Sequence, residues 1–351
     1  MIRKTFLFIE IGLLLAGLLL LACIWLQRQA LQQPLQLEQE YLLEVAPGAT
    51  PGGLLNQLQQ QGVLADAFWL RQYWRFNLAN TPLHSGEYKL EVGMTALDLL
   101  ELWQRAEVVQ YSLALIEGWN LQQIRSALAK AEKLEQSLVQ VSDADLMTTL
   151  GWPGVHPEGW FFPDTYQYVR GMRDIDLLKQ AGKRQEQVLA QEWQSRAADL
   201  PYRTPYEALI MASLIEKETG VGAEREQIAG VFVRRLGLRM LLQTDPTVIY
   251  GLGERYTGNL TRANLREPSA YNTYLNAGLP PTPIALAGRE AIHAALHPAD
   301  GKSLYFVARG DGSHVFSETL SEHNKAVREY QLKRRADYRS SPARQSDKEK
   351  K

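Results

Sequence analysis

The segment Gly86-Glu-Tyr-Lys-Leu-Glu-Val-Gly93-Met-Thr95 combines the signals of a strand, a tight turn and a helix start. Gly93 permits a tight turn after the strand-like residues, and Thr95 is a residue type preferred at helix N-caps. The leucines that follow, at positions 97, 99, 100 and 102, are spaced to bury one face of a helix. This unit predicts an α+β fold.

The same pattern recurs on both sides of this segment. It occurs earlier in Tyr41-Leu-Leu-Glu-Val-Ala-Pro-Gly48-Ala-Thr50 and later in Tyr111-Ser-Leu-Ala-Leu-Ile-Glu-Gly118-Trp-Asn120. Thr50-Pro51 even places proline at the first helical position, where its missing N–H does no harm. The first two units together, residues 41–108, resemble a LysM-like module, a small sheet-and-helix fold that binds N-acetylglucosamine polymers. A plain α+β packing domain is the alternative interpretation.

The N-terminus carries an apolar run from Thr5 to Leu26, broken only by Glu10. At about 1.5 Å per residue, a helix of this length spans the ~30 Å hydrocarbon core of a membrane. Arg3 and Lys4 precede the run, so the positive-inside rule keeps residues 1–4 in the cytoplasm and exports the rest. We therefore predict a retained transmembrane helix at 5–26. The alternative is a lipoprotein signal, because Leu20-Leu21-Ala22-Cys23 resembles a lipobox.

The remaining boundaries follow from changes in composition. A Gln-rich stretch with Pro34 predicts a linker at 27–40, residues 109–332 form a mixed α+β domain, and 333–351 form a polar tail. The net charge of −1 gives no basic footprint for nucleic acid. The chain has one cysteine and no His spacing such as HExxH, so we expect no disulfide, metal or cofactor.

The strongest chemical signal lies between Thr204 and Gly220. Thr204-Pro205-Tyr206-Glu207 predicts a capping box, and Gly220 predicts the helix stop. The apolar residues between them cover nearly every side of a helix, which indicates a buried helix. A carboxyl on its last turn is buried and lies at the negative end of the helix dipole, and both effects raise its pKa. Such a carboxyl suits a general acid that protonates a glycosidic oxygen.

Two carboxyls compete for this role. Glu216 and Glu218 each extend an apolar stripe of the helix, so helical periodicity does not choose between them. The alternative is that both are exposed C-terminal charges, one of them pairing with Lys217 or Arg225.

Later segments combine polar and aromatic residues in loops, which often line clefts. Asp245 is placed to cap a helix that begins at Pro246, and residues 303–307 and 314–316 predict a hairpin across Gly310-Asp311-Gly312. The candidate cleft residues are Gln243, Asp245, Tyr250, Tyr271, Asn272 and Tyr274.

Several motifs in a fixed order resemble the YceG-like family of endolytic murein transglycosylases. They are Glu117-Gly118, Glu158-Gly-Trp-Phe-Phe-Pro-Asp-Thr, Ala212-Ser-Leu-Ile-Glu-Lys-Glu-Thr219, Leu242-Gln-Thr-Asp-Pro-Thr-Val-Ile-Tyr-Gly251, Tyr271-Asn-Thr-Tyr274, Gly278-Leu-Pro-Pro281 and Phe316-Ser-Glu-Thr-Leu-Ser-Glu-His-Asn324. The resemblance implies a transmembrane helix, a LysM-like subdomain and a catalytic domain. It also implies that Glu218 is the catalytic acid/base.

The activity implied by the resemblance is that of a lyase of the cell wall. The enzyme would cut the β-1,4 bond from N-acetylmuramic acid to N-acetylglucosamine within nascent peptidoglycan strands, leave 1,6-anhydro ends and end strand elongation. Its implied place is the inner membrane, with the catalytic domain in the periplasm near peptidoglycan synthases.

Two other functions remain open. A muramidase would cut the same bond with water and need a second carboxylate from Glu158, Asp164 or Asp245. A glycan-binding scaffold without activity would use the LysM-like module and the anchor alone.

Overall fold

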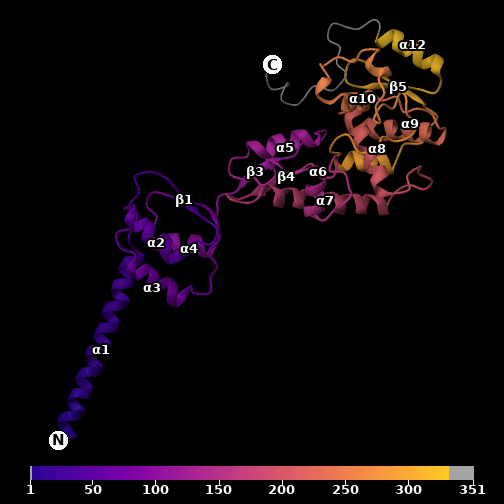
Figure 1. The fold of residues 1–351 in the computed structure, drawn as a ribbon. Helices are drawn as coiled ribbons and strands as arrows, with labels where there is room; N and C mark the ends of the chain where they lie inside the picture. The colour runs from indigo at the N-terminus through magenta and orange to yellow at the C-terminus, as the bar shows by residue number, and fades with distance from the viewer. Residues whose placement is uncertain (1, 332–351) are drawn as a thin grey trace. The chain divides into compact units, whose positions relative to one another are not determined.

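The computed structural model describes the backbone of residues 2–331 and the side chains of residues 8–331, so the tail predicted at 333–351 lies outside the described residues. The chain divides into two compact units. The first is Met1–Ser112 with Glu132–Glu135 and Gln167–Met172, and the second is the rest. The domain bounds predicted from the sequence, 41–108 and 109–332, stay a prediction. Figure 1 shows the elements of each unit.

The first helix, α1 (Ile2–Leu31), contains an apolar stretch from Phe8 to Leu31 with a mean hydropathy of 2.5. That stretch of 24 residues is long and apolar enough to cross a membrane. The helix continues beyond Leu26, and its last residues, Ala30 and Leu31, are buried in the core of the first unit. Leu35 is buried too, so much of the predicted linker belongs to this unit.

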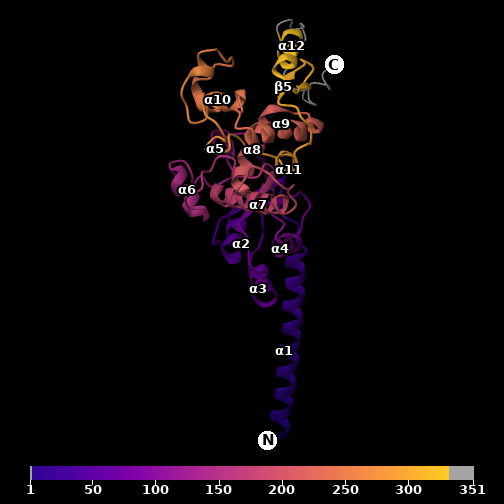
Figure 2. The same cartoon turned by 90° about the vertical axis from the view of Figure 1, so that its right-hand side faces the viewer.

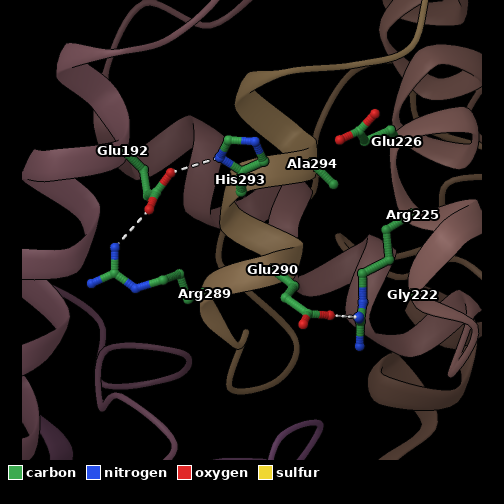
Figure 3. Close-up of a pocket in the computed structure, with 8 residues that line it drawn as sticks. All are labelled: Glu192, Gly222, Arg225, Glu226, Arg289, Glu290, His293 and Ala294. Atoms are coloured by element: carbon green, nitrogen blue, oxygen red, sulfur yellow. Dashed lines mark hydrogen bonds and ion pairs between the residues drawn. The ribbon is translucent and has the colours of Figure 1, made fainter.

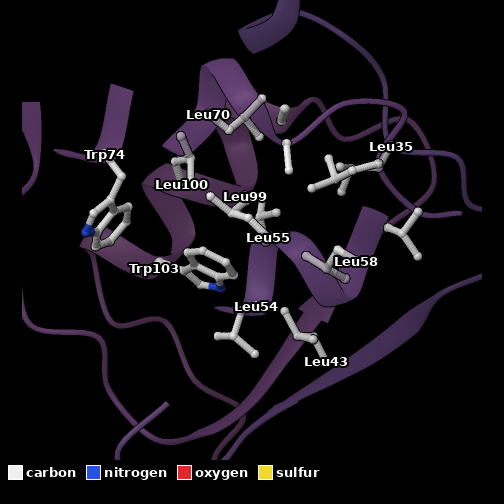
Figure 4. Packing of buried hydrophobic residues seen from close by; sticks show 14 of the residues in the cluster. Leu35, Leu43, Leu54, Leu55, Leu58, Leu70, Trp74, Leu99, Leu100 and Trp103 are labelled. Atoms are coloured by element: carbon white, nitrogen blue, oxygen red, sulfur yellow. The ribbon is translucent and has the colours of Figure 1, made fainter. Parts of the chain in front are cut away.

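The first unit pairs two strands and packs helices against them. β1 (Tyr41–Val45) is followed by α2 (Pro51–Gln60), α3 (Phe68–Asn77), β2 (Gly86–Leu90) and α4 (Ala96–Gln104). The two strands are antiparallel, with Tyr41 opposite Leu90. Leucines from both strands and from α2 and α4 form the core, and Trp74 and Trp103 pack edge-on at one side of it with ring centroids 5.9 Å apart (Figure 4).

The repeated strand–turn–helix prediction is confirmed in all three places. Thr50, Thr95 and Asn120 cap α2, α4 and α5 (Leu121–Lys130), each through a side-chain oxygen that accepts a backbone N–H. The turn glycines have positive φ, as at Gly93 with φ +93°, where a side chain would be strained. Helix α3 was not anticipated from the sequence. The LysM-like assignment of this unit stays a prediction.

A buried ion cluster ties the later segments into the first unit. Glu87 on β2 is 4% exposed, and its Oε1 lies 2.9 Å from Lys133 Nζ and 3.1 Å from Arg170 Nη1. The Tyr111 hydroxyl donates to the other carboxylate oxygen. Burial acts to raise the pKa of Glu87, but these hydrogen bonds and charges hold it below its usual value.

The second unit is mostly helical. The strands β3 (Tyr111–Ala114) and β4 (Thr165–Tyr168) pair with each other, and the division between the two units passes through both strands. The other elements of the second unit are α5, α6 (Asp143–Leu150), α7 (Asp174–Gln194), α8 (Pro205–Glu218), α9 (Arg225–Gly237), α10 (Asp245–Leu252), α11 (Arg289–Leu296), β5 (Tyr305–Ala308), β6 (His314–Ser317) and α12 (Leu320–Tyr330). The hairpin of β5 and β6 was predicted and is confirmed.

Helix α8 forms the centre of this unit. Every residue from Ala208 to Ile215 is buried, which confirms the buried helix predicted from the sequence. The helix packs against α7, α9, α10 and α11, and Figure 2 shows it between α7 and α9. Helix α8 is therefore packed on several sides, and only its two ends, the first turn and the last turn from Glu216 to Glu218, are partly exposed.

Candidate active site

The two ends of α8 are fixed by different devices. At the start, Thr204 Oγ1 accepts from Glu207 N at 3.3 Å, but the Glu207 carboxylate accepts from Arg203 N. The predicted capping box is therefore only half formed. At the other end, Thr219 is extended with φ −142°, so the helix stops before Gly220 and Glu218 is its last residue. Glu218 thus lies at the negative end of the helix dipole, as predicted.

Glu218 is held by one hydrogen bond, which the Thr244 hydroxyl donates to Oε1. Thr244 is itself 2% exposed, and its backbone N donates to Thr273 Oγ1 at 3.1 Å. Within the described part of the chain, Oε2 of Glu218 has no hydrogen-bond partner, and it is not enclosed. A half-buried carboxyl with one fixed and one open oxygen can hand a proton to a bound ligand.

The surroundings of Glu218 favour its protonated form. Burial is the main reason that its pKa is raised to about 7, and the nearby Asp245 carboxylate raises it further. The hydrogen bond from Thr244 and the charge of Arg235 act in the opposite direction. Near neutral pH, Glu218 therefore exchanges its proton readily in either direction, which suits a group that acts first as acid and then as base.

Glu216 points into a different set of contacts. Its Oε2 accepts from Gly288 N at 3.1 Å, and its Oε1 lies 3.9 Å from Arg225 Nη2. Burial and the neighbouring Glu117 raise its pKa to about 7 as well. Both oxygens therefore face protein partners, which separates Glu216 from Glu218 where helical periodicity did not.

A cleft of about 770 Å³ opens beside the end of α8. Lys217 lines it, whereas Glu218 does not, and the start of α10 contributes Pro246, Ile249 and Tyr250. The opposite side comes from the start of α5, and Gln122 there donates to Glu254 at 2.9 Å. The cleft wall is rich in amide, hydroxyl and aromatic groups, a combination that suits a polar sugar ligand.

Glu158 lines this cleft, as do the carboxyls of Asp143 and Glu254. It is 3% exposed, and Leu121 N donates to its Oε1 at 3.0 Å and to its Oε2 at 3.2 Å. Tyr250 donates its hydroxyl to Oε2 at 3.0 Å. Burial raises the pKa of Glu158 to about 7 despite these hydrogen bonds. Both oxygens are engaged, so Glu158 joins the start of α5 to α10.

The predicted cleft residues fall into two groups, one beside Glu218 and the other around Tyr250. Asp245 does not cap α10 with its side chain, because Thr244 is the N-cap residue and Asp245 is the first helical one. The Asp245 carboxylate instead accepts from the Tyr274 hydroxyl at 2.6 Å. Gln243 is exposed and has a positive φ of 52°, a strained conformation for a residue with a side chain.

The other group surrounds Tyr250. Tyr271 packs edge-on against Tyr250 with ring centroids 4.7 Å apart, and its hydroxyl bonds to Thr282 Oγ1 at 2.9 Å. Asn272 is 1% exposed, and its side chain donates to the carbonyl oxygens of Leu265 and Glu267. Asn272 therefore shapes the loop from within rather than offering a polar group to the cleft.

Thr244 and Arg235 were not singled out from the sequence. Arg235 is 8% exposed and donates to the carbonyl oxygens of Leu304 and Leu242, which holds the segment that leads to Thr244. The only signal for Thr244 was its place directly before Asp245-Pro246, where a helix N-cap belongs.

A separate hollow of about 440 Å³ lies between α7, α9 and α11 (Figure 3). Its side chains bond to one another: Glu192 accepts from Arg289 at 2.7 Å and lies 2.9 Å from His293 Nδ1, and Arg225 pairs with Glu290. Ligand atoms of Glu192, His293 and His297 lie within 4.8 Å of one another, a grouping that no short sequence motif indicates because Glu192 precedes His293 by 101 residues. The Glu192 carboxylate is therefore already engaged by Arg289 and His293 within the protein.

Known proteins are similar to this chain in sequence and in structure. An endolytic murein transglycosylase of Bacillus subtilis is 32% identical over 305 residues, which cover 82% of this chain and 84% of that protein. One from Streptococcus pneumoniae is 27% identical over 285 residues, 71% of this chain and 51% of that protein. A crystal structure of a YceG-like protein from Listeria monocytogenes aligns with a TM-score of 0.54 and 30% identity, covering 82% of this chain and 99% of that one.

The family model described as the YceG-like family matches residues 43–329, which include β1, β2, α8, Glu158 and Glu218. The chain therefore belongs to the YceG-like family.

Proposed function

We propose that this protein is a lytic transglycosylase, a lyase that cleaves the β-1,4 bond from N-acetylmuramic acid to N-acetylglucosamine within peptidoglycan strands. Its curated relatives carry the name endolytic murein transglycosylase, and the family resemblance extends over most of the chain. The finer parts of the proposal are the 1,6-anhydro product, the use of Glu218 and the role in ending strand elongation.

One observation carries the choice of Glu218. Three carboxyls of the second unit have pKa values raised to about 7, but both oxygens of Glu158 and of Glu216 face protein partners. Glu218 has a partner on Oε1 and leaves Oε2 open, within the part of the chain described. A general acid needs an open oxygen to reach the substrate, because proton transfer takes place over hydrogen-bond distance.

In the proposed reaction, Glu218 donates its proton to the glycosidic oxygen as the bond to the anomeric carbon breaks. The resulting carboxylate then accepts the proton of the muramic C6 hydroxyl, whose oxygen attacks the anomeric carbon. The product is a 1,6-anhydro sugar and no water is consumed. Ordinary retaining and inverting glycosidases need two carboxylates, whereas here the nucleophile belongs to the substrate.

The cleft next to α8 supplies the proposed binding surface. Its wall contains Tyr250 and Tyr256, and the segment with Asp245 and Tyr274 lies against Glu218. We assign Gln243, Asp245, Tyr250, Tyr271 and Tyr274 to substrate binding or to the support of binding residues. Asn272 belongs to the support, since its side chain is used within the loop.

The muramidase alternative has one specific observation in its favour. Glu158 lines the cleft and has a pKa raised to about 7, as a second catalytic carboxyl would. Its engagement by Leu121 N and Tyr250 on both oxygens counts against a role as base or nucleophile.

Mass spectrometry of peptidoglycan digested by the full-length chain in detergent separates these functions. We expect anhydromuramic ends with the unchanged protein and none with Glu218→Gln. Reducing ends would indicate a hydrolase, and tight binding by a folded protein without any cleavage would indicate a glycan-binding scaffold.

The proposed location is the inner membrane, with α1 as the anchor and both units in the periplasm near the peptidoglycan synthases. The apolar stretch Phe8–Leu31 supports the anchor. If the enzyme ends elongation, cells that carry Glu218→Gln in place of the unchanged protein should make longer glycan strands. Strand lengths equal to those of cells with the active enzyme would contradict that role.

A further inference from the structure

Helix α3 presents aromatic side chains on the face opposite its core contacts. Leu70, Trp74 and Leu78 are buried and lie on one side of the helix. On the other side, Phe76 is 75% exposed and Phe68 is 47% exposed. Trp69 and Tyr73 are partly exposed but also pack against the core, so the outward face consists of Phe68 and Phe76 with Gln72 between them.

The two exposed phenylalanines share this face with the polar residues Gln72 and Arg75. Surface helices normally place charged and polar residues opposite the core. Aromatic rings, above all those of Trp and Tyr, are instead enriched where a protein meets the interface between water and lipid. The composition of the outward face of α3 therefore points to a lipid contact.

The position of α3 agrees with such a contact. It packs against α1, and both views show it beside the end of α1 that enters the first unit (Figure 1 and Figure 2). Along that end of α1, Cys23 and Gln27 are partly covered, whereas Ala30 and Leu31 are buried. These residues belong to the last turns of the apolar stretch Phe8–Leu31. Helix α3 therefore lies at the level where the anchor leaves the hydrocarbon.

Two further features mark the same level as an interface. Trp25 is 61% exposed on α1, as expected for a ring that anchors a helix at the membrane surface. Arg28 on α1 and Arg75 on α3 are both exposed. Their guanidinium groups can bond to the phosphate groups of phospholipid headgroups.

We propose that the outward face of α3, formed by Phe68, Phe76 and the exposed edges of Trp69 and Tyr73, inserts into the headgroup layer of the same bilayer that α1 crosses. This inference rests on the proposed role of α1 as a membrane anchor. The first unit is then held by two elements, one spanning the bilayer and one lying on it. Two elements restrict rotation about the anchor, which a single helix permits.

The test uses the full-length chain in vesicles of phosphatidylethanolamine and phosphatidylglycerol, with Cys23→Ser to remove the native thiol. Single thiols introduced by Phe76→Cys, Phe68→Cys, Val92→Cys and Leu19→Cys carry an environment-sensitive fluorophore. Val92 is the matched control, because it is 59% exposed in the same unit but lies in the turn after β2. Leu19 reports on the anchor, since it is 66% exposed within the apolar stretch.

We expect the probes at 76 and 68 to be quenched by lipids with a nitroxide near the headgroup. We also expect iodide in the water to quench them about threefold less than the probe at 92. The probe at 19 should be quenched by nitroxides deep in the acyl chains.

The possible failures are distinguishable. If 19 is embedded while 76 and 68 are as open to iodide as 92, the proposal for α3 is wrong and the anchor stands. If 19 itself is open to iodide, the anchor fails and the inference falls with it. If protection at 76 disappears when the protein is diluted in lipid, a second copy of the chain covers the face instead.

Discussion

The surroundings of Glu158 and of Glu218 show how one physical effect can serve two purposes. Burial raises the pKa of both carboxyls to about 7. Glu158 accepts hydrogen bonds on both oxygens from Leu121 N and Tyr250, whereas Glu218 accepts one from Thr244 and keeps Oε2 open. A raised pKa therefore does not identify a catalytic acid by itself. The oxygen left without a protein partner makes the difference.

The largest expected effect concerns the rate of cleavage. Glu218→Gln removes the transferable proton, so the rate of anhydromuropeptide release should fall by about 10²–10⁴-fold. Glu216→Gln, a change in the same helical turn, should leave the rate within about threefold, because Glu216 faces Gly288 and Arg225. Initial rates by liquid chromatography with mass spectrometry check this. An equally large fall in the cleavage rate for Glu158→Gln would show that the free oxygen of Glu218 does not set it apart from Glu158.

The next effect concerns stability and pH. The pKa of Glu218 is raised from 4.5 to about 7 on folding. Its protonated form therefore favours the folded state fully below pH 4.5, and this contribution is lost as the pH rises through 7. Glu218→Gln should leave stability unchanged at pH 4.5 and raise it by up to about 2–3 kcal/mol at pH 8.

Calorimetry at the two pH values measures this difference, with Glu226→Gln as a control at an exposed carboxylate. A stability gain at pH 8 that is equally large at pH 4.5 would mean that titration of Glu218 is not its cause.

A smaller effect on stability is expected when the hydrogen bond between Tyr250 and Glu158 is removed. Tyr250→Phe removes a hydrogen bond to a buried carboxyl, so it should reduce stability by about 1–3 kcal/mol. In a double-mutant cycle, Tyr250→Phe should reduce stability much less when Glu158→Gln is already present. Tyr256→Phe is the matched control, since Tyr256 lines the same cleft. Additive losses in the cycle would show that Tyr250 and Glu158 act separately.

The smallest effect sharpens the role of Thr244. Its hydrogen bond lowers the pKa of Glu218, so Thr244→Val should move the alkaline limb of the activity profile to higher pH. Thr244→Ser keeps the hydroxyl and should restore the original limb. Activity measured from pH 5 to 9 tests this, and an unmoved limb in Thr244→Val would mean that Thr244 does not control the titration.

Local signals in the sequence were sufficient for the repeated units and for α8. Thr50, Thr95 and Asn120 are strong N-caps next to glycine turns, and the apolar run before Glu218 fits a buried helix. Helix α3 was missed because its N-cap, Ala67, offers no side-chain oxygen. The sequence therefore gives no clear signal for where this helix begins.

The orientation of the carboxyls could not be predicted in the same way. Glu216 is fixed by Gly288, 72 residues away, and Glu218 by Thr244, 26 residues away. Both contacts arise from tertiary packing around α8, whereas helical periodicity describes only one helix at a time. The family motif supplied what the local pattern lacked, namely the preference for Glu218.

The ion cluster at Glu87 has a consequence for the order in which the chain is made. Once the ribosome has passed residue 112, both strands and all four helices of the first unit exist, yet Lys133 and Arg170 do not. A buried carboxylate without its partners is unfavourable by several kcal/mol. The first unit therefore reaches its full stability only after the chain has been synthesised through Arg170, which lies beyond β4. The first unit therefore completes its folding while the second unit is still being synthesised.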